Sequence, residues 1–137
     1  MQTVNKLVAH YKDGRVFKGF TRDFVPAKPS FHLASVANQD FVKEIVLDEL
    51  KALFFVKDFS GDPSYEPKQD FSAISTAPGK KLKVKFQDGE VLLGTTQAFH
   101  RDKTGFFLYP ADPACNIQRA FVINSALESV EIIGQGT

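Results

Sequence analysis

Two ten-residue stretches, KDGRVFKGFT (residues 12–21) and QDGEVLLGTT (residues 87–96), share one skeleton of Asp-Gly, a second glycine and a threonine. Asp-Gly between apolar residues is a strong hairpin signal, because glycine accepts the positive φ of a tight turn. The second glycine lies in the returning strand and indicates a bulge, a bend or a close backbone approach. Each stretch therefore predicts a β-hairpin, and the repetition favours an element of the fold over a binding site.

The repetition extends well beyond the hairpin. Residues 6–34 align with residues 81–109 at an offset of 75, and residues 50–56 align with residues 127–133 at an offset of 77. Both copies alternate apolar and polar residues over short runs, a pattern typical of half-buried strands. Short sheets leave exposed edges unless they close or pair with a neighbour. The sequence predicts an all-β protein that arose by internal duplication, with five short strands in each copy.

One segment supports two interpretations. KEIVLDELKALFF (43–55) is rich in Glu, Leu, Lys and Ala, which favour a helix. Its counterpart in the second copy, RAFVINSALESVEII (119–133), contains many β-branched residues, which favour strands. Two strands are the preferred interpretation, and a helix is the alternative.

The order of these features resembles the Sm-like fold: an alternating strand, Asp-Gly, an inner glycine, a phenylalanine, an apolar triplet and two closing strands. In the second copy the features are Asp88-Gly89, Gly94, Phe99, Phe106-Phe107-Leu108, Phe121-Val122-Ile123 and Val130–Ile133, and in the first copy Asp13-Gly14, Gly19, Phe24, Phe31 and Leu33. The resemblance implies two tandem five-stranded Sm-like (SH3-like) small barrels. They would span residues 1–57 and 80–137, with a linker at 58–79 that packs partly on the barrels. The tandem form also resembles a bacterial domain family of unknown function.

Sm-like proteins typically bind RNA through an Asp- and Asn-containing loop and through a second loop with an Arg-Gly or similar pair. The corresponding first loop reads VPAKPS (25–30) in one copy and HRDKTG (100–105) in the other. The second loop reads Leu47-Asp48 and Asn124-Ser125. Neither copy keeps the signature, so the resemblance implies the fold and carries over no RNA-binding residues.

Composition narrows the functional classes. The chain has 137 residues and a formal net charge of +1, so it lacks the basic excess that accompanies tight nucleic-acid binding. A single cysteine, Cys115, excludes an internal disulfide and a zinc site built from several cysteines. No stretch has the length of a signal-peptide core or an apolar membrane span, which predicts a soluble cytoplasmic protein without a membrane partner. No nucleotide- or cofactor-binding motif occurs, and no cofactor is predicted.

No catalytic or metal-binding constellation stands out. His10, His32 and His100 are the natural acid–base or metal-binding candidates, yet none is repeated between the copies and no two have a ligand spacing. Cys115 has no neighbouring base to activate its thiol. The histidines are therefore interpreted as isolated surface or boundary residues, and the protein is expected not to be an enzyme.

Two other groups are candidate interaction residues. Basic side chains occupy the loop that follows the hairpin in both copies, where they would hold a phosphate or an acidic partner, or would simply be solvated. These loop residues are Arg22, Lys28, His100, Arg101 and Lys103. The chain also has 14 phenylalanines, more than barrels of some sixty residues bury alone. Phe54, Phe55 and Phe107 interrupt the alternation and are predicted at an interface between barrels or subunits, with core-only packing as the alternative.

The preferred functional hypothesis is a non-enzymatic binding or adaptor module that contacts a protein partner or itself. One alternative is single-stranded nucleic-acid binding through the basic loops. Another is a small-molecule or enzymatic site between the barrels that uses His10, His32 or His100.

Overall fold

The computed structural model describes residues 5–38, 40–57, 59, 79–97, 99, 103–110 and 116–136. The described residues form ten strands and two short 3-10 turns. The first repeat contains β1 (Asn5–Tyr11), β2 (Val16–Thr21), β3 (Ser30–Ser35), β4 (Val42–Val46), η1 (Leu47–Glu49) and β5 (Leu50–Val56). The second repeat contains β6 (Gly79–Phe86), β7 (Val91–Thr96), β8 (Gly105–Pro110), β9 (Ile117–Ile123), η2 (Asn124–Ala126) and β10 (Leu127–Gly136). Two strands flank η1, so the strand interpretation of residues 43–55 is confirmed and the helix alternative is wrong.

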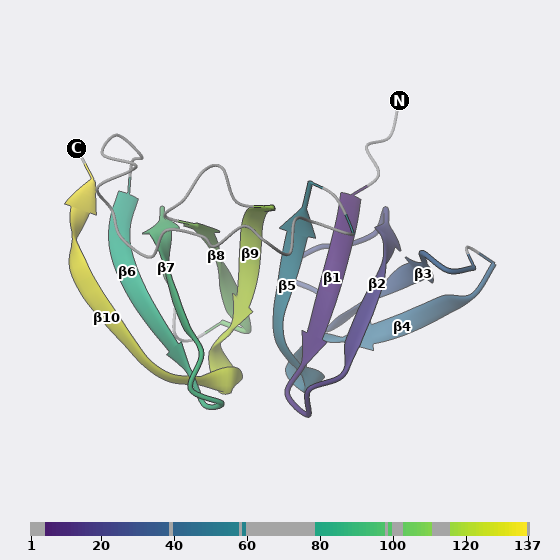
Figure 1. The fold of residues 1–137 in the computed structure, drawn as a ribbon, viewed down its shortest axis with the longest axis horizontal. Helices are drawn as coiled ribbons and strands as arrows, with labels where there is room; N and C mark the ends of the chain where they lie inside the picture. Colours follow the sequence, from purple (N-terminus) through teal and green to yellow (C-terminus); the bar gives the residue numbers. More distant parts are fainter. Residues whose placement is uncertain are drawn as a thin grey trace.

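All ten strands belong to one antiparallel sheet in the order β10-β6-β7-β8-β9-β5-β1-β2-β3-β4 (Figure 1). The all-β class is confirmed. Among the described strands, hydrogen bonds do not close this sheet into a barrel. The expected pair of separate barrels is instead seen as two curved halves of one sheet, because β5 and β9 pair with each other at the centre and satisfy edges that would otherwise be open.

The two Asp-Gly turns have the same geometry. Gly14 and Gly89 both have φ of 95°, in the left-handed region that glycine adopts without strain. In each turn the aspartate carboxylate accepts a hydrogen bond of 3.0 Å from the backbone N–H two residues later, at Arg15 and at Glu90. The repeated ten-residue stretch therefore forms two equivalent hairpins, β1–β2 and β6–β7, as the sequence predicts.

The inner glycines mark close backbone approaches. Strand β2 pairs with β3 at Gly19↔Ser35 and Phe20↔Ala34, and β7 pairs with β8 at the corresponding two positions. A Cβ at Gly19 would overlap the carbonyl oxygen of Ala34, and one at Gly94 would overlap that of Tyr109. The sequence leaves a bulge, a bend and a close backbone approach open for these glycines, and the structure has the close approach.

The described residues pack into two apolar cores. The first core contains Leu7, Ala9, Tyr11, Phe31, Leu33, Ile45, Leu47, Leu50, Leu53, Phe55, Phe121 and Ile123. The second core contains Val8, Ala52, Phe54, Val56, Leu82, Val84, Phe86, Phe106, Leu108, Ala120, Val122 and Ala126. Each core thus includes side chains from both repeats.

The two central strands explain why each core contains side chains from both repeats. Along β5, Leu53 and Phe55 enter the first core, while Phe54 on the opposite face enters the second. Along β9, Phe121 enters the first core and Val122 enters the second. A strand with a core on each face needs a continuous apolar run, which is what LFFV and AFVI provide.

Two sequence-based expectations concern regions that are mostly undescribed. The predicted linker at 58–79 lies outside the described residues except for Phe59 and Gly79. The ring of Phe59 lies 5.2 Å from that of Phe20 and packs against the second core. Within the described residues, no helix is long and apolar enough to cross a membrane.

Candidate functional site

An ion-pair cluster lies at the junction of the two repeats. Lys51 extends from β5, and its ammonium lies 2.8 Å from the carboxylate of Asp88 in the β6–β7 turn. It also donates a hydrogen bond to Glu90 on the far side of that turn. The Lys51 side chain is only 12 % exposed, while both carboxylates are about half exposed. The cluster therefore ties β5 of the first repeat to the hairpin of the second.

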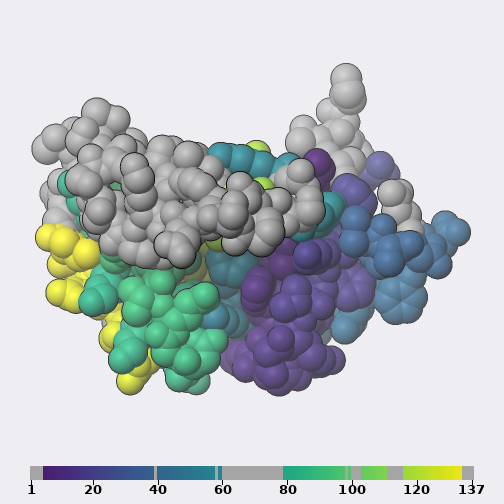
Figure 2. Space-filling view, viewed as in Figure 1, coloured from purple at the N-terminus to yellow at the C-terminus, as the bar shows by residue number. Residues whose placement is uncertain are grey.

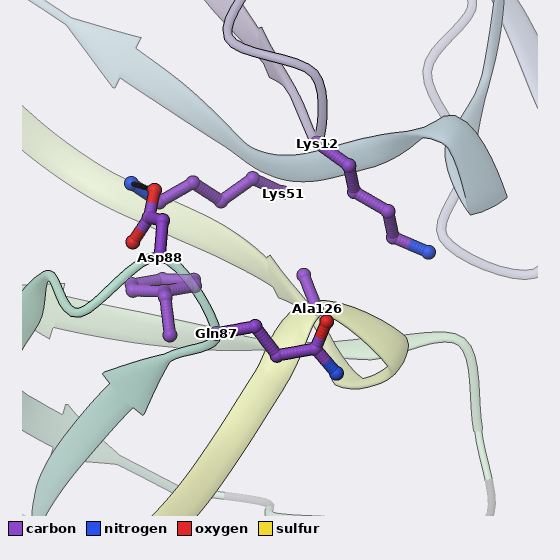
Figure 3. A pocket seen from close by; sticks show the side chains of 6 residues that line it. Lys12, Lys51, Gln87, Asp88 and Ala126 are labelled. Carbon is purple, nitrogen blue, oxygen red and sulfur yellow. Dashed lines mark ion pairs between the residues drawn. The ribbon is translucent and has the colours of Figure 1, made fainter.

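A small cavity of about 40 Å³ lies beside this cluster. Its lining residues are Lys12, Lys51, Phe86, Gln87, Asp88 and Ala126. Figure 3 shows Lys12 and Lys51 on one side of the cavity, opposite Gln87, Asp88 and Ala126. Lys12 reaches across to the hydroxyl of Ser125 at 2.7 Å. A cavity of this size holds about one water molecule and is far below the volume of a metabolite-binding site.

The electrostatics of the cluster favour its charged form. Burial of Lys51 opposes its charge, but the hydrogen bonds that it donates to Asp88 and Glu90 outweigh this effect and raise the pKa of the ammonium. The hydrogen bond from Lys51 is the main cause of the lowered pKa of Asp88. Both shifts favour the charged forms of the two side chains, which are the forms that make the ion pair.

Lys51→Met should destabilise the protein by about 1 kcal/mol, because it keeps the buried stem and removes the charge from a partly screened pair. Equilibrium denaturation at low and at high salt measures the effect, which should shrink as salt rises. The control is Lys85→Met, which removes an exposed pair with Glu128 at 3.2 Å and should change stability by less than about 0.5 kcal/mol. Equal losses for the two variants would contradict a special role for the Lys51 cluster.

His10 lies on β1 next to this junction. Its ring packs edge-on against Phe54 with centroids 4.8 Å apart. Partial burial is the main cause of its lowered pKa, and the Lys51 ammonium lowers it further. The carboxylates of Glu90 and Asp88 act in the opposite direction. His10 is therefore a neutral packing residue at neutral pH.

The lowered pKa of His10 predicts how the stability of the folded protein changes with pH. The folded protein binds the proton less well than the unfolded chain, so the protein should lose stability as pH falls below the unfolded value of about 6.5. His10→Gln removes this titration, and its stability should fall less than that of the wild type between pH 7 and pH 5. Denaturant titrations at both pH values measure the two losses. Parallel losses in the two proteins would show that His10 does not cause this pH dependence.

His32 has a different environment from His10. Asp23 accepts hydrogen bonds from the His32 backbone N–H at 3.0 Å and the Thr21 hydroxyl at 3.1 Å, and its other oxygen lies 2.8 Å from His32 Nδ1. Partial burial raises the pKa of Asp23, but these hydrogen bonds outweigh it and the net pKa is lowered. The carboxylate thus fixes the turn after β2. Its counterpart in the second repeat is Ala98, which has no carboxylate, so the sequence does not repeat this acidic residue.

The basic loop residues are only partly described. Arg22 and Lys28 are exposed in the β2–β3 loop, and Lys103 is exposed before β8. His100 and Arg101 lie outside the described residues, as does Cys115. On β6, the face with Lys83 and Lys85 lies beside acidic residues of β10, with Lys83 opposite Glu131 and Lys85 paired with Glu128.

The three phenylalanines lie at or near the central junction. Phe54 and Phe55 are buried on opposite faces of β5, in the second and first cores. Phe107 is partly buried against the first core, with its ring centroid 6.0 Å from that of Phe55. Arg119 of β9 lies over both rings, at 4.3 Å from Phe55 and 4.5 Å from Phe107. A guanidinium over two aromatic faces adds a cation–π contact between the repeats.

Sequence reasoning did not identify Lys51, Asp88 or Arg119 as site residues. The available signal is that Lys51 breaks the repeat, since its counterpart in the second copy is Glu128. Among the described residues, no three His, Cys, Asp or Glu side chains are grouped so as to hold a metal ion. The junction is chemically suited to holding the two halves of the sheet together.

Comparisons with known proteins give one family. A family of unknown function, DUF6982, matches residues 3–134, which is nearly the whole chain and includes both repeats. No match was found among the curated proteins or among the solved structures. The duplicated, centrally joined sheet described above is therefore the fold of a member of the DUF6982 family, to which this chain belongs.

Proposed function

We propose that this chain is a non-enzymatic module, built from two Sm-like repeats, that binds protein through the open edges of its sheet. The observation that carries the proposal is that β4 and β10 end the sheet and, among the described residues, have a strand partner on one side only. Both edges carry large exposed apolar side chains. These are Phe41 (55 %) and Val42 (54 %) at β4, and Ile132 (54 %) and Ile133 (49 %) on β10.

Such edges are a natural binding surface. An open strand edge presents unpaired backbone N–H and C=O groups, which an extended segment of another chain satisfies by adding a strand. Exposed apolar residues on that strand add contact area and specificity for the incoming chain. The other notable feature, the junction cavity, supports the proposal indirectly, because its small volume and paired charges suit a structural role.

Site-specific photo-crosslinking in cells tests this function. A photoreactive amino acid is placed at Val42 on β4 or at Ile132 on β10. The control position is Tyr109, an exposed side chain (41 %) on the inner strand β8. The proposal expects covalent protein adducts from both edge positions and none from Tyr109. An absence of adducts at both edges, or equal labelling at Tyr109, would overturn it.

A further inference from the structure

We infer that the partner at these edges is a second copy of the same chain, with β4 of one copy paired antiparallel to β10 of the next. This inference rests on the proposed function and names its partner. Figure 2 shows the two edges at opposite ends of the molecule, β10 in yellow at one end and β4 in blue at the other. Each copy therefore has one edge of each kind, and pairing of β4 with β10 joins copies head to tail.

The internal junction is the template for this contact. By the repeat alignment, β9 is the counterpart of β4 and β5 is the counterpart of β10, both at an offset of 77. The molecule already pairs β5 with β9 through its centre. The two free edges are thus the same two strands of the repeat, in the same order, without a partner strand in the described chain. A second copy extends the sheet by repeating a contact that the fold has already built once.

The internal register converts directly into an intermolecular one. Phe54 lies opposite Ala120 in the junction. The counterparts of these two residues are Glu131 and Lys43, so the proposed contact places opposite charges directly across from each other. Oppositely charged cross-strand pairs are favourable, and like charges in the same place are unfavourable.

The neighbouring position gives a second match. Phe55 lies opposite Arg119 in the junction, and the counterparts are Ile132 and Val42. Both of these side chains are 54 % exposed in the single chain. Pairing β4 with β10 would bring the two exposed side chains into contact and remove apolar surface from water.

The ion-pair cluster also has a counterpart, in which two of the three charges are reversed. Lys51 corresponds to Glu128 on β10, and its partner Glu90 corresponds to Arg15 in the β1–β2 turn. The proposed contact therefore places Glu128 of one copy near Arg15 of the next. Arg15 is 62 % exposed and lies 2.7 Å from Asp13 of its own turn, and Glu128 is 55 % exposed. Lys51 and Glu90 both have counterparts of opposite sign, so this pair stays attractive, whereas Asp88 corresponds to Asp13, which keeps its negative charge beside Arg15. Glu128 also pairs with Lys85 of its own sheet at 3.2 Å, so the new pair with Arg15 would add to existing contacts on both sides.

The surface of β10 is hollowed where the incoming strand would lie. A cavity of about 150 Å³ is lined by Asn124, Leu127, Glu128, Ser129 and Val130. The counterparts of Leu127 and Val130 in the first repeat are Leu50 and Leu53, and both are fully buried in the core that includes side chains from β9. On β10 the same positions are only partly buried. The difference fits a surface that β4 of another copy would cover, with Glu44 opposite Val130 where the internal junction has Phe121 opposite Leu53.

The composition of the edges sets the strength and the selectivity of the contact. Where the internal junction has the apolar pair Phe54 and Ala120, the proposed contact has the charged pair Glu131 and Lys43. Charges on edge strands usually prevent indiscriminate pairing. Here Lys43 on β4 and Glu131 on β10 have opposite signs and lie in register, which favours pairing of β4 with β10. The association should therefore be reversible and should weaken as salt rises. A head-to-tail contact produces a closed ring when its rotation closes and a filament when it does not.

Analytical ultracentrifugation of the full chain across concentration and salt tests the inference. The wild type should form species heavier than the 15.2 kDa monomer at low salt, and these should dissociate at high salt. Lys43→Glu and Glu131→Lys should each weaken association about tenfold, because each replaces an attraction by a repulsion. The control is Lys18→Glu, the same charge change on the inner strand β2, which should leave association unchanged.

Charge exchange makes the test specific for this geometry. The double variant Lys43→Glu/Glu131→Lys should associate again, and so should an equimolar mixture of the two single variants, because every β4 then meets a β10 of opposite charge. Lys43 lies over the rings of Tyr11 and Phe17, at 5.0 and 5.5 Å, so thermal unfolding should confirm that its variant is folded. The exposed Glu131 lies opposite Lys83 of its own sheet, so its variant needs the same check and then tests the pair from the other side.

Three results would overturn the inference. They are a wild type that stays monomeric at millimolar concentration and low salt, an oligomer that neither reversal weakens, and single variants that the exchange does not rescue. A monomeric protein that still crosslinks to another protein through Val42 or Ile132 would leave the proposed function standing and reject the second copy as the partner. Crosslinked adducts between two copies at both edges would support the two proposals together.

Discussion

Gly94→Ala should destabilise the protein by about 3 kcal/mol, a cost at the upper end of overpacking a well-filled site. The added Cβ would overlap the carbonyl oxygen of Tyr109 and lie 2.8 Å from Cγ of Leu108. The first obstacle is backbone, so no change of rotamer relieves it, and β7 and β8 must separate where they make their two pairs. For a domain of this size, thermal unfolding should shift downward by roughly 10 °C.

Two controls locate the cause of this loss. Gly89→Ala places a Cβ where no heavy atom lies within 4 Å, so its cost comes from the positive φ alone and should be about 1 kcal/mol. Gly19→Ala meets the same obstacle in the first repeat, from the carbonyl oxygen of Ala34, and should cost as much as Gly94→Ala. A loss at Gly94 no larger than that at Gly89 would contradict the close approach of β7 and β8.

The local parts of this fold could be predicted because their signals are local. Asp-Gly turns, alternating apolar residues and an inner glycine each act within about ten residues, and the duplication gave every signal twice. The hairpins and the strands of each copy follow from such patterns. The inner glycine indicated a bulge, a bend or a close approach, and the structure has the close approach at Gly94. The ambiguity at residues 43–55 was resolved by comparison with the second copy, whose β-branched residues favour strands.

The joining of the copies could not be predicted in the same way. Pairing of β5 with β9 connects segments that are more than sixty residues apart, and no turn chemistry specifies it. The indirect signal was the unbroken apolar run LFFV, which indicated an interface and left its partner open. The ion pairs of Lys51 were less accessible still, since they depend on which turn of the second repeat lies beside β5.

Phe121→Ala should cost about 3–5 kcal/mol, the usual range for removing a buried phenylalanine ring. Phe121 is only 2 % exposed, and its ring lies 5.5 Å from that of Phe24 and 5.1 Å from that of Phe107. Although Phe121 belongs to the second repeat, it packs in the first core. Its loss should therefore reduce amide hydrogen-exchange protection in β1 and β3, as well as in its own repeat.

A comparison with Phe31→Ala isolates the effect of the contact that Phe121 makes with the core of the other repeat. Phe31 is equally buried in the first core but comes from the first repeat, so both variants should destabilise the same set of amides. Phe121→Leu keeps most of the apolar volume and should cost less than about 1.5 kcal/mol. Protection lost only within β6–β10 after Phe121→Ala would mean that the two halves fold independently. Protection lost in both halves would mean that a side chain exchanged across the β5–β9 junction makes the duplicated sheet one cooperative unit.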